Sequence, residues 1–454
     1  MGRLDNMIDI IIPTVDAYKH VELCVSAIER FTRNPFKIIL VDNGSRAPEA
    51  KKFLASARER GHVVVSLPDN VCFSKAVNAG LSVSKAEYVS IINDDAYVND
   101  GWDGAMIADL SDPTVGMVGA SSNAAAGFMG APEFAEVLPV PYLVFVHVML
   151  KRSVIDKVGL LDAETFTGFG SEDLDYSWRV RAAGYRLKVS RAFTFHVGGM
   201  TMGAERFGGV QARDHEYRRM SLKLEEKWGH KFVAKNTKMF PKIAVATPSY
   251  EPKVWHQFFR SMMLLKKTGP FQLEYYQTSR TLVQFAREEI VKGALADGSF
   301  DYIWFVDDDM TFPPDTLIRL LAHQKSFVTA LAYQRRAPYN VCIFDHVPDK
   351  TEHGHFDFVR SPEHTGLRKI GGCGFACALI STEVFQALEY PRFKFETFGE
   401  DLHLCRNAMY AGIPIYADTD LIIGHLGDVV EVDEGHVARY KAAQAQQANQ
   451  LAYR

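Results

Sequence analysis

The sequence contains few cysteines, no long apolar segment and no strong excess of either charge. Its six cysteines among 454 residues include no Cys-x-x-Cys pair, which favours buried or idle thiols in a reducing compartment. Fifty-one Lys and Arg against 55 Asp and Glu give a net charge of −4. Because positive and negative side chains are nearly equal in number, the protein has no overall field that favours binding to nucleic acid or to an anionic membrane. A local basic patch remains compatible with this composition.

The longest apolar run, residues 137–150, contains two prolines and His147. It is shorter than the ~20 apolar residues that cross a bilayer, and the first residues lack the pattern of a signal peptide. With 47% hydrophobic and 23% charged residues, the composition is that of a globular protein, and the length predicts two or three domains. We therefore expect a cytoplasmic protein without a membrane span.

Short β-branched runs alternate with helical segments in the first part of the chain. The expected strands are Ile8–Ile12, Lys37–Val41, Val63–Leu67 and Tyr88–Ile92, and the expected helices between them are His20–Phe31, Ala47–Arg60 and Ser74–Ser84. This alternation predicts an α/β fold with a mostly parallel sheet. Because ligands bind beyond the carboxyl ends of such strands, the residues directly after each strand are candidates for the functional site.

A second series of the same landmarks follows the first in the same order. The matched segments are Ile8–Thr14 with Lys242–Tyr250, Tyr88–Asp95 with Tyr302–Asp309, Phe169–Asp175 with Phe398–His403, and His196 with His425. Such a series predicts two copies of one domain, the second lacking about one βα unit. We expect a first domain over residues 1–210, a solvated helical and basic linker over 211–240, a second domain over 241–430 and a C-terminal helical tail over 431–454.

Carboxylates gather after the fourth expected strand of the first copy and at its counterpart in the second. Asp307–Asp309 directly follow the apolar run Ile303–Val306, and a divalent cation such as Mg²⁺ or Mn²⁺ would relieve their repulsion and clamp a diphosphate. An acidic turn that caps the next helix is the structural alternative. His196 and His425 lie at equivalent positions of the two copies, which favours a further metal ligand over a merely packed histidine.

A Glu-Asp pair opens a helical segment in each copy, at Glu172-Asp173 and Glu400-Asp401. Acidic residues at a helix N-terminus are stabilised by the helix dipole, which would explain either pair alone. Because both pairs follow glycine-containing turns at equivalent places, we expect a general base facing a cleft.

Taken in order, these motifs resemble the inverting family 2 glycosyltransferases, whose GT-A fold is a Rossmann-like nucleotide-diphospho-sugar transferase domain. Each motif alone is weak, but the ordered set is specific and covers nearly the whole chain. The first copy contributes Ile12–Thr14, Val41–Ser45, Asn70–Gly80, Asn93–Asp95, Lys151–Asp162, Gly170–Arg179 and His196. The second contributes Thr247–Ser249, Ala286–Glu289, Asp307–Asp309, Gly371–Phe375, Gly399–Asp401 and His425.

The resemblance implies a nucleotide-diphosphate sugar as donor, Mn²⁺ or Mg²⁺ as cofactor, and Asp173 and Asp401 as the catalytic bases. The implied metal ligands are Asp95, His196, Asp307, Asp309 and His425. The implied donor-binding residues are Pro13, Thr14, Asp42, Asn70, Asn78, Asp94, Thr247, Ser249, Arg287 and Asp308. Two departures stand out: Asn93 replaces the first aspartate of a strict Asp-x-Asp motif, and the second copy has no obvious counterpart of Val41–Ser45.

We therefore expect a metal-dependent inverting glycosyltransferase that is bifunctional and acts on a carbohydrate or glycoconjugate acceptor. One alternative is a single active copy joined to a binding or scaffolding copy. Another is an enzyme that glycosylates modified DNA bases, as some phage enzymes do; the net charge does not favour it, since only the basic linker offers a phosphate-binding stripe. A lectin-like protein and a nucleotidyltransferase fit the motifs less well.

Overall fold

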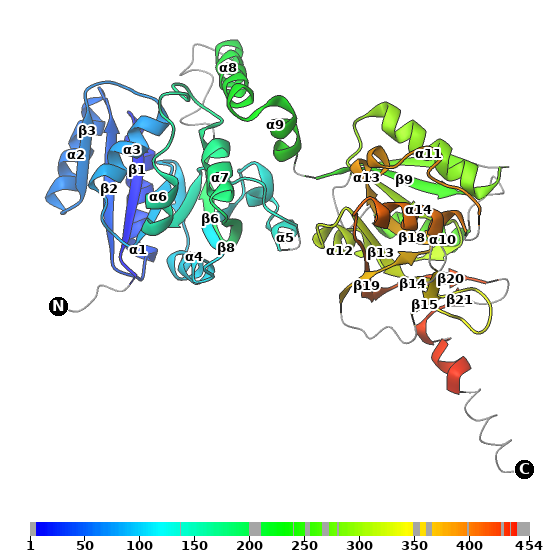
Figure 1. The fold of residues 1–454 in the computed structure, drawn as a ribbon. Helices are drawn as coiled ribbons and strands as arrows, with labels where there is room; N and C mark the ends of the chain where they lie inside the picture. Colours follow the sequence, from blue (N-terminus) through cyan, green and yellow to red (C-terminus); the bar gives the residue numbers. More distant parts are fainter. Residues whose placement is uncertain are drawn as a thin grey trace, which may run out of the picture. The chain divides into compact units, whose positions relative to one another are not determined.

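The computed structural model describes residues 6–136, 138–198, 210–238, 240–249, 255–265, 272–278, 281–347, 355–359, 366–396, 399–427, 431–435 and 437–442. The chain divides into two compact units, residues 1–239 and 240–454 (Figure 1). Each is an α/β unit built on its own central sheet. The expected fold class, two tandem α/β domains, is confirmed.

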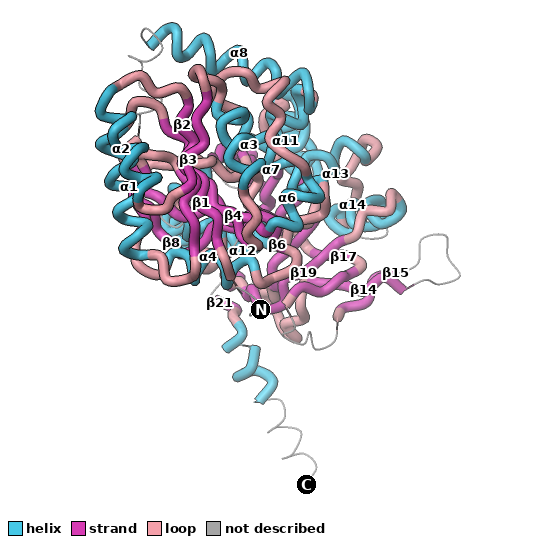
Figure 2. Tube along the Cα trace, turned by 90° about the vertical axis from the view of Figure 1, so that its left-hand side faces the viewer, coloured by secondary structure: helices cyan, strands magenta, loops and turns pink. Residues whose placement is uncertain are grey.

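The first unit contains an eight-stranded sheet in the order β3-β2-β1-β4-β7-β6-β8-β5. Helices α1 and α2 lie on one side of strands β1–β3, and α3 lies on the other (Figure 2). The strands are β1 (Ile8–Thr14), β2 (Phe36–Asn43), β3 (Val63–Leu67), β4 (Tyr88–Ile92), β5 (Ala96–Val98), β6 (Val115–Ser122), β7 (His147–Lys151) and β8 (Arg186–His196). The helices are α1 (Tyr18–Phe31), α2 (Pro48–Glu59), α3 (Phe73–Val83), α4 (Trp102–Leu110), α5 (Pro132–Ala135), α6 (Arg152–Val158) and α7 (Glu172–Ala182), with a 3-10 turn at Gly127–Gly130.

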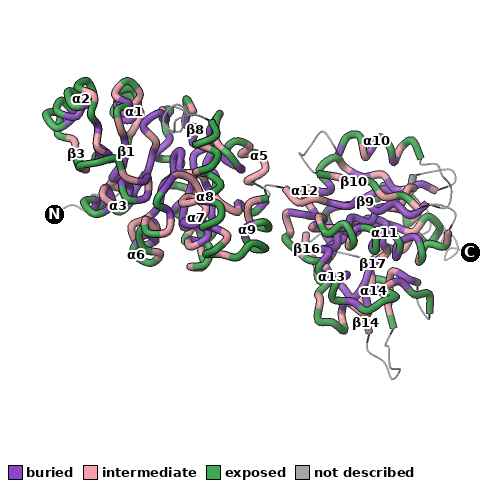
Figure 3. Tube along the Cα trace, turned by 90° about the horizontal axis from the view of Figure 1, so that it is seen from above, coloured by how far each residue is buried: buried purple, intermediate pink, exposed green. Residues whose placement is uncertain are grey.

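The second unit contains a seven-stranded sheet in the order β10-β9-β11-β18-β13-β19-β16. Its core strands are buried, whereas helix α10 is largely exposed (Figure 3). The sheet strands are β9 (Lys242–Pro248), β10 (Gln272–Thr278), β11 (Tyr302–Val306), β13 (Phe327–Leu331), β16 (Leu367–Ile370), β18 (Cys377–Ser381) and β19 (Ile415–Ile422). Smaller sheets contain β12 (Met310–Thr311), β20 (Gly424–Leu426) and β21 (Glu431–Val432), and β14 (Ile343–Val347), β15 (His355–Phe358) and β17 (Gly372–Cys373). The helices are α10 (His256–Leu265), α11 (Val283–Asp297), α12 (Thr316–Ala322), α13 (Thr382–Ala387) and α14 (Glu400–Tyr410).

The strand register shows that the two units are copies of one design. Ile8 lies opposite Tyr88 in the first, and Ile243 lies opposite Tyr302 in the second. Six consecutive strands of the two sheets match in order, and β3 has no counterpart, so the second copy lacks one βα unit as expected.

The sheets are more mixed than the expected, mostly parallel ones. In the first sheet, the pairs among strands β1 to β4 are parallel, but β7 runs antiparallel to its neighbours β4 and β6. In the second sheet, β18 likewise runs antiparallel to its neighbours β11 and β13. The sequence alternation misses this reversal because the buried strands on either side of it look alike.

The 211–240 segment is helical, as α8 (Val210–Trp228) and α9 (His230–Thr237), but it is not the solvated linker that we expected. Met220 and Leu224 of α8 are buried against Phe166 and Trp178 of the first unit. Lys227 forms ion pairs with two carboxylates of the same unit. Most side chains of α8 are charged or polar, so the sequence does not indicate that Met220 and Leu224 make an apolar contact.

The end of the chain is described only in part. β21, within the predicted tail, pairs with β20 of the second unit, whereas residues 443–454 and Phe398 of the repeated motif lie outside the described residues. All six cysteines are free thiols, and five of them are buried. Among the described helices, none combines the length and apolar character needed to cross a membrane.

Candidate active sites

In the first copy, an aspartate and a histidine meet at the end of β4. Asp95 follows that strand, and the next residue, Ala96, lies opposite His196 in the β5–β8 pair. The His196 Nε2 atom is 3.2 Å from Asp95 Oδ1, and its Nδ1 donates to the Ala124 carbonyl at 2.7 Å. Hydrogen bonds to Asp95 and Ala124 outweigh burial and raise the pKa of His196.

The second copy repeats this arrangement. Met310, directly after Asp309, lies opposite His425; His425 Nε2 is 3.3 Å from Asp309 Oδ2, and its Nδ1 donates to the Tyr333 carbonyl at 2.8 Å. In both copies, the residue after the histidine also donates its backbone N–H to the aspartate carbonyl. The two predicted Asp-His sets are therefore brought together by the same local structure.

The Asp-His pairs fit a divalent cation. A backbone carbonyl can only accept, so it fixes each Nδ1 as a donor and turns Nε2 toward the carboxylate, the usual orientation of a metal-binding histidine. An oxygen and an imidazole nitrogen suit Mn²⁺. Within the described ranges, no group of three His, Cys, Asp or Glu side chains could hold an ion unaided, so further ligands would have to come from donor phosphates or water.

Two arginines approach the predicted metal ligands of the second site. Asp307, one of those ligands, accepts from Arg287 Nη2 at 3.3 Å, and the charges of Asp309 and His425 also act on its carboxyl group. Arg335 Nη1 lies 3.0 Å from Asp309 Oδ2, the same oxygen that His425 approaches. Arg335 is two residues beyond Tyr333, and the first copy has Ala126 two residues beyond the matching Ala124, so the sequence motifs gave no sign of this guanidinium.

The predicted base of the first copy lies at the start of α7. Asp173 accepts from the backbone N–H groups of Leu174 and Phe145, and the carbonyl of the next residue, Val146, accepts from Asn93 at the end of β4. This chain of contacts links the base to the strand end. Burial raises the pKa of Asp173, and burial together with the Asp173 charge raises the pKa of Glu172.

The predicted base of the second copy lies beside a buried guanidinium. Arg287 donates to Glu400 at 2.5 Å and to Asp307 at 3.3 Å, and its guanidinium lies 5.2 Å from the centre of the Phe375 ring. Burial raises the pKa of Asp401, although the charge of Arg287 opposes the shift. Burial also raises the pKa of Asp307 to about 6. Arg287 therefore holds the carboxylates of Glu400 and Asp307 together, and the contact with a donor diphosphate expected of it stays a prediction.

The predicted nucleotide side of the first copy lies where β1 and β2 end. Thr14, which follows Pro13, lies opposite Asp42 in the sheet, and Asp42 accepts from the Ser45 backbone at 2.9 Å. The Thr14 hydroxyl is buried without a hydrogen-bond partner among the described residues. Asp94, another predicted donor-binding residue, is buried in the turn that follows β4.

Two predicted donor-binding asparagines of the first copy brace loops. The Asn43 amide donates to Asn70 at 3.0 Å and bonds to both backbone groups of Val71. Asn78 donates to the carbonyl of Leu161 at 2.9 Å and accepts from its N–H at 3.0 Å. Both polar ends of the Asn78 amide therefore bind the loop at Leu161, and the donor contact expected of Asn78 stays a prediction.

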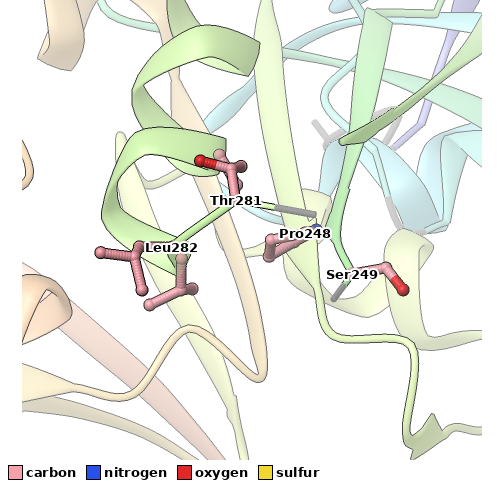
Figure 4. A pocket seen from close by; sticks show the side chains of 6 residues that line it. Pro248, Ser249, Thr281 and Leu282 are labelled. Atoms are coloured by element: carbon pink, nitrogen blue, oxygen red, sulfur yellow. The ribbon is translucent and has the colours of Figure 1, made fainter. Parts of the chain in front are cut away.

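The second copy has a cavity of about 210 Å³ where β9 ends and α11 begins (Figure 4). It is lined by Pro248, Ser249, Thr281, Leu282, Val283 and Ala286. Ser249 also donates to the predicted donor-binding Asp308 at 2.6 Å, and Thr247 is fully buried in β9. By strand register, Pro248 corresponds to Pro13, and the counterpart of Asp42 is residue 279, which lies outside the described residues.

Comparisons with solved structures found weak similarities. GalNAc-T7 with UDP, GalNAc and Mn²⁺ is 15% identical with a TM-score of 0.38, over 42% of this chain and 43% of that one. The mannosyltransferase PcManGT from Pyrobaculum calidifontis, in complex with GDP-Man and Mn²⁺, is 16% identical with a TM-score of 0.38, over 50% and 73%. A197 from STIV is 17% identical with a TM-score of 0.32, over 41% and 86%. This chain thus spans less than half of GalNAc-T7.

A search of curated proteins found no match. The model of glycosyl transferase family 2 matches residues 9–130 and 278–389, which together make up just over half of the chain. One matched region lies in each compact unit. The chain therefore belongs to glycosyl transferase family 2.

Proposed function

We propose that each copy transfers a sugar from a nucleotide-diphosphate donor to an acceptor hydroxyl with inversion, so that the chain is bifunctional. One observation carries this proposal. Both units bring an aspartate at a strand end to a histidine with the same backbone contacts, and both place a partly buried aspartate at the start of the helix nearby. Membership of glycosyl transferase family 2 supports it.

In the first copy, different residues would serve as the base, the metal ligands and the nucleotide-binding groups. Asp173 takes the proton of the acceptor hydroxyl as the oxygen attacks the anomeric carbon, and the bond from that carbon to the diphosphate breaks on the opposite face. A divalent cation held by Asp95 and His196 would neutralise the departing diphosphate. Thr14 and Asp42 would hold the nucleotide. The raised pKa of Asp173 makes it a stronger base that is still ionised near neutral pH.

The second copy would work in a different electrostatic environment. The charge of Arg287 opposes the rise in the pKa of Asp401, whereas backbone hydrogen bonds oppose the rise in the pKa of Asp173. Arg335 lies on Asp309, where a cation would bind. These two arginines also favour the alternative in which the second copy binds a sugar or scaffolds the first without catalysing transfer.

For the acceptor we propose a carbohydrate or glycoconjugate. The rival DNA-modifying function would need free cations on the 211–240 segment. Several of these are paired with carboxylates: Arg213 with Asp214, Arg219 with Glu216, Lys223 with Glu226, and Lys227 with Asp162. This neutralisation leaves a weak basic stripe.

The test measures Mn²⁺-dependent nucleotide release from a panel of sugar nucleotides. It compares the wild-type chain with Asp173→Asn, Asp401→Asn and the surface control Asp100→Asn, whose exposed carboxylate pairs with Arg33. Loss of a general base should slow its own reaction by about 10²–10⁴-fold. Two donors, each lost with a different variant, support bifunctionality. If Asp401→Asn changes no release while Asp173→Asn abolishes it, the second copy is a binding domain.

A further inference from the structure

Helix α10 of the second unit is the counterpart of α1 in the first. Each follows the first strand of its sheet, and their buried positions match at a constant spacing along the chain: Val21, Cys24 and Ile28 correspond to Phe258, Ser261 and Leu265. The two helices therefore present equivalent faces to their sheets and equivalent faces to solvent.

The solvent-facing sides of these helices differ in chemistry. Where α1 exposes Glu22 and Ser26, α10 exposes Phe259 and Met263, at 57% and 46% of their surface. Trp255, one helical turn before Phe259, is 46% exposed. Residues spaced by four lie on one face of a helix, so these three exposed side chains form an apolar stripe along α10.

Charge in this part of the sequence has one sign. From residue 252 to 273 there is no Asp or Glu, but there are four Lys and Arg. One of these, Arg260, is exposed beside the apolar stripe. The other three lie outside the described residues. In contrast, α1 contains two exposed glutamates, Glu22 and Glu29. An exposed helix with aromatic and aliphatic side chains on one face, in a segment rich in cations, is typical of a segment that lies in the surface of an anionic bilayer.

We propose that α10 docks the second unit onto an anionic lipid surface, with Trp255, Phe259 and Met263 entering the headgroup region and Arg260 beside the lipid phosphates. A protein partner fits less well. Ten helical residues extend only about 15 Å, whereas a stable protein interface buries about 1,000 Å² or more. A bilayer can bind such a narrow apolar stripe, because mobile lipids rearrange around the inserted side chains. The inference does not depend on the proposed sugar transfer.

Co-sedimentation of the full chain with vesicles tests the proposal without any donor or acceptor. The vesicles contain phosphatidylcholine alone or phosphatidylcholine with phosphatidylglycerol. We expect binding to the anionic vesicles, weaker binding as salt rises, and at least a tenfold loss of affinity in the double variant F259E/M263E. The matched control is L23E/S26E, which places the same two negative charges on exposed positions of α1, one of them the apolar Leu23 (56% exposed), and should leave binding unchanged.

Because the substituted side chains are exposed, both variants should unfold at the wild-type temperature, which thermal melts followed by circular dichroism would check. Failure of the wild-type chain to bind anionic vesicles would overturn the proposal. So would a folded F259E/M263E variant that binds as well as wild type, or one whose only change is the loss of self-association in sedimentation velocity.

Discussion

Single residues decide how the two copies differ, and the Glu-Asp pairs show it best. Glu172 and Glu400 hold the same position in the repeat, one residue before the expected base. Glu172 is partly buried and has Asp173 as its charged neighbour, whereas Glu400 is buried and receives a 2.5 Å hydrogen bond from Arg287. One motif therefore produces a carboxyl that retains its proton in the first copy and a buried ion pair in the second.

Replacing Glu172 by Gln should stabilise the first unit as pH rises. The raised pKa of Glu172 means that the native state holds a proton that the unfolded chain releases near the ordinary glutamate pKa. Between these two pKa values, stability falls with rising pH by up to about 1.4 kcal/mol per unit. Gln cannot ionise, so E172Q removes this decline. Urea unfolding of wild type and variant between pH 5 and 8 measures the difference.

The matched change E400Q should act in the opposite direction. It removes one of the carboxylates around the buried Arg287 guanidinium, and breaking such a pair costs about 3 kcal/mol. This decrease in the free energy of unfolding should be measurable near neutral pH in the same urea experiment. Equal effects of E172Q and E400Q would contradict the different surroundings that we assign to these glutamates.

Arg335 should weaken metal binding in the second copy. Its guanidinium lies on the carboxylate oxygen where a cation would bind, and a partly exposed ion pair is worth up to about 1 kcal/mol. Arg335→Ala should therefore tighten Mn²⁺ binding by up to about fivefold, as measured by the electron paramagnetic resonance signal of free Mn²⁺. Ala126→Arg, at the matching position, should weaken the site of the first copy. If neither change alters the titration, Arg335 has no influence on the metal.

Much of the site could be predicted from sequence because it follows the strands. Asp95 and Asp309 come directly after buried runs, and the repeat marks His196 and His425 as their partners. The roles of Asn78, Arg287 and Arg335 could not be predicted, because each depends on a contact with a loop or helix distant in the chain. Residue type and spacing predict that a polar side chain lies near the site, but they do not predict its hydrogen-bond or ion-pair partner.

Among the elements, α8 departs most from its sequence pattern. Its mean hydropathy is low and most of its side chains are exposed, which is typical of a solvated helix. Only Met220 and Leu224 are buried, yet they close a cluster around Trp178 of α7, the helix that begins with the predicted base. Two residues on one face are too few to produce a clear helical period. Their importance comes from the tertiary contact.

The packing of α8 can be tested by a pair of neighbouring substitutions. Met220→Ala removes a fully buried side chain and should cost the first unit about 2–5 kcal/mol. Leu222→Ala, two residues away, removes a side chain that is 59% exposed and should change stability by less than about 0.5 kcal/mol. Chemical unfolding of both variants measures this. Similar small effects would mean that α8 is dispensable for the first unit.

On the scale of the whole molecule, each unit has its own core. The cluster around Phe305 and Phe375 draws all its members from residues 244–437, and the cluster that holds α8 lies wholly in the first unit. Independent cores are the physical basis for independent folding. The domain boundary is thus set by packing. The compact first unit extends to residue 239, past the residue 210 at which the landmarks of the repeat end.

Independent cores predict that thermal unfolding has two transitions, each moved by different substitutions. Met220→Ala should lower only the transition of residues 1–239, because its cavity lies in that unit, and Glu400→Gln should lower only that of residues 240–454. Distant substitutions without shared partners add, so the double variant should shift both by the same amounts as the single ones. Differential scanning calorimetry of the four proteins checks this. A single transition that either change moves as a whole would mean that the two copies fold as one cooperative body, and the separate stabilities argued for them would not exist.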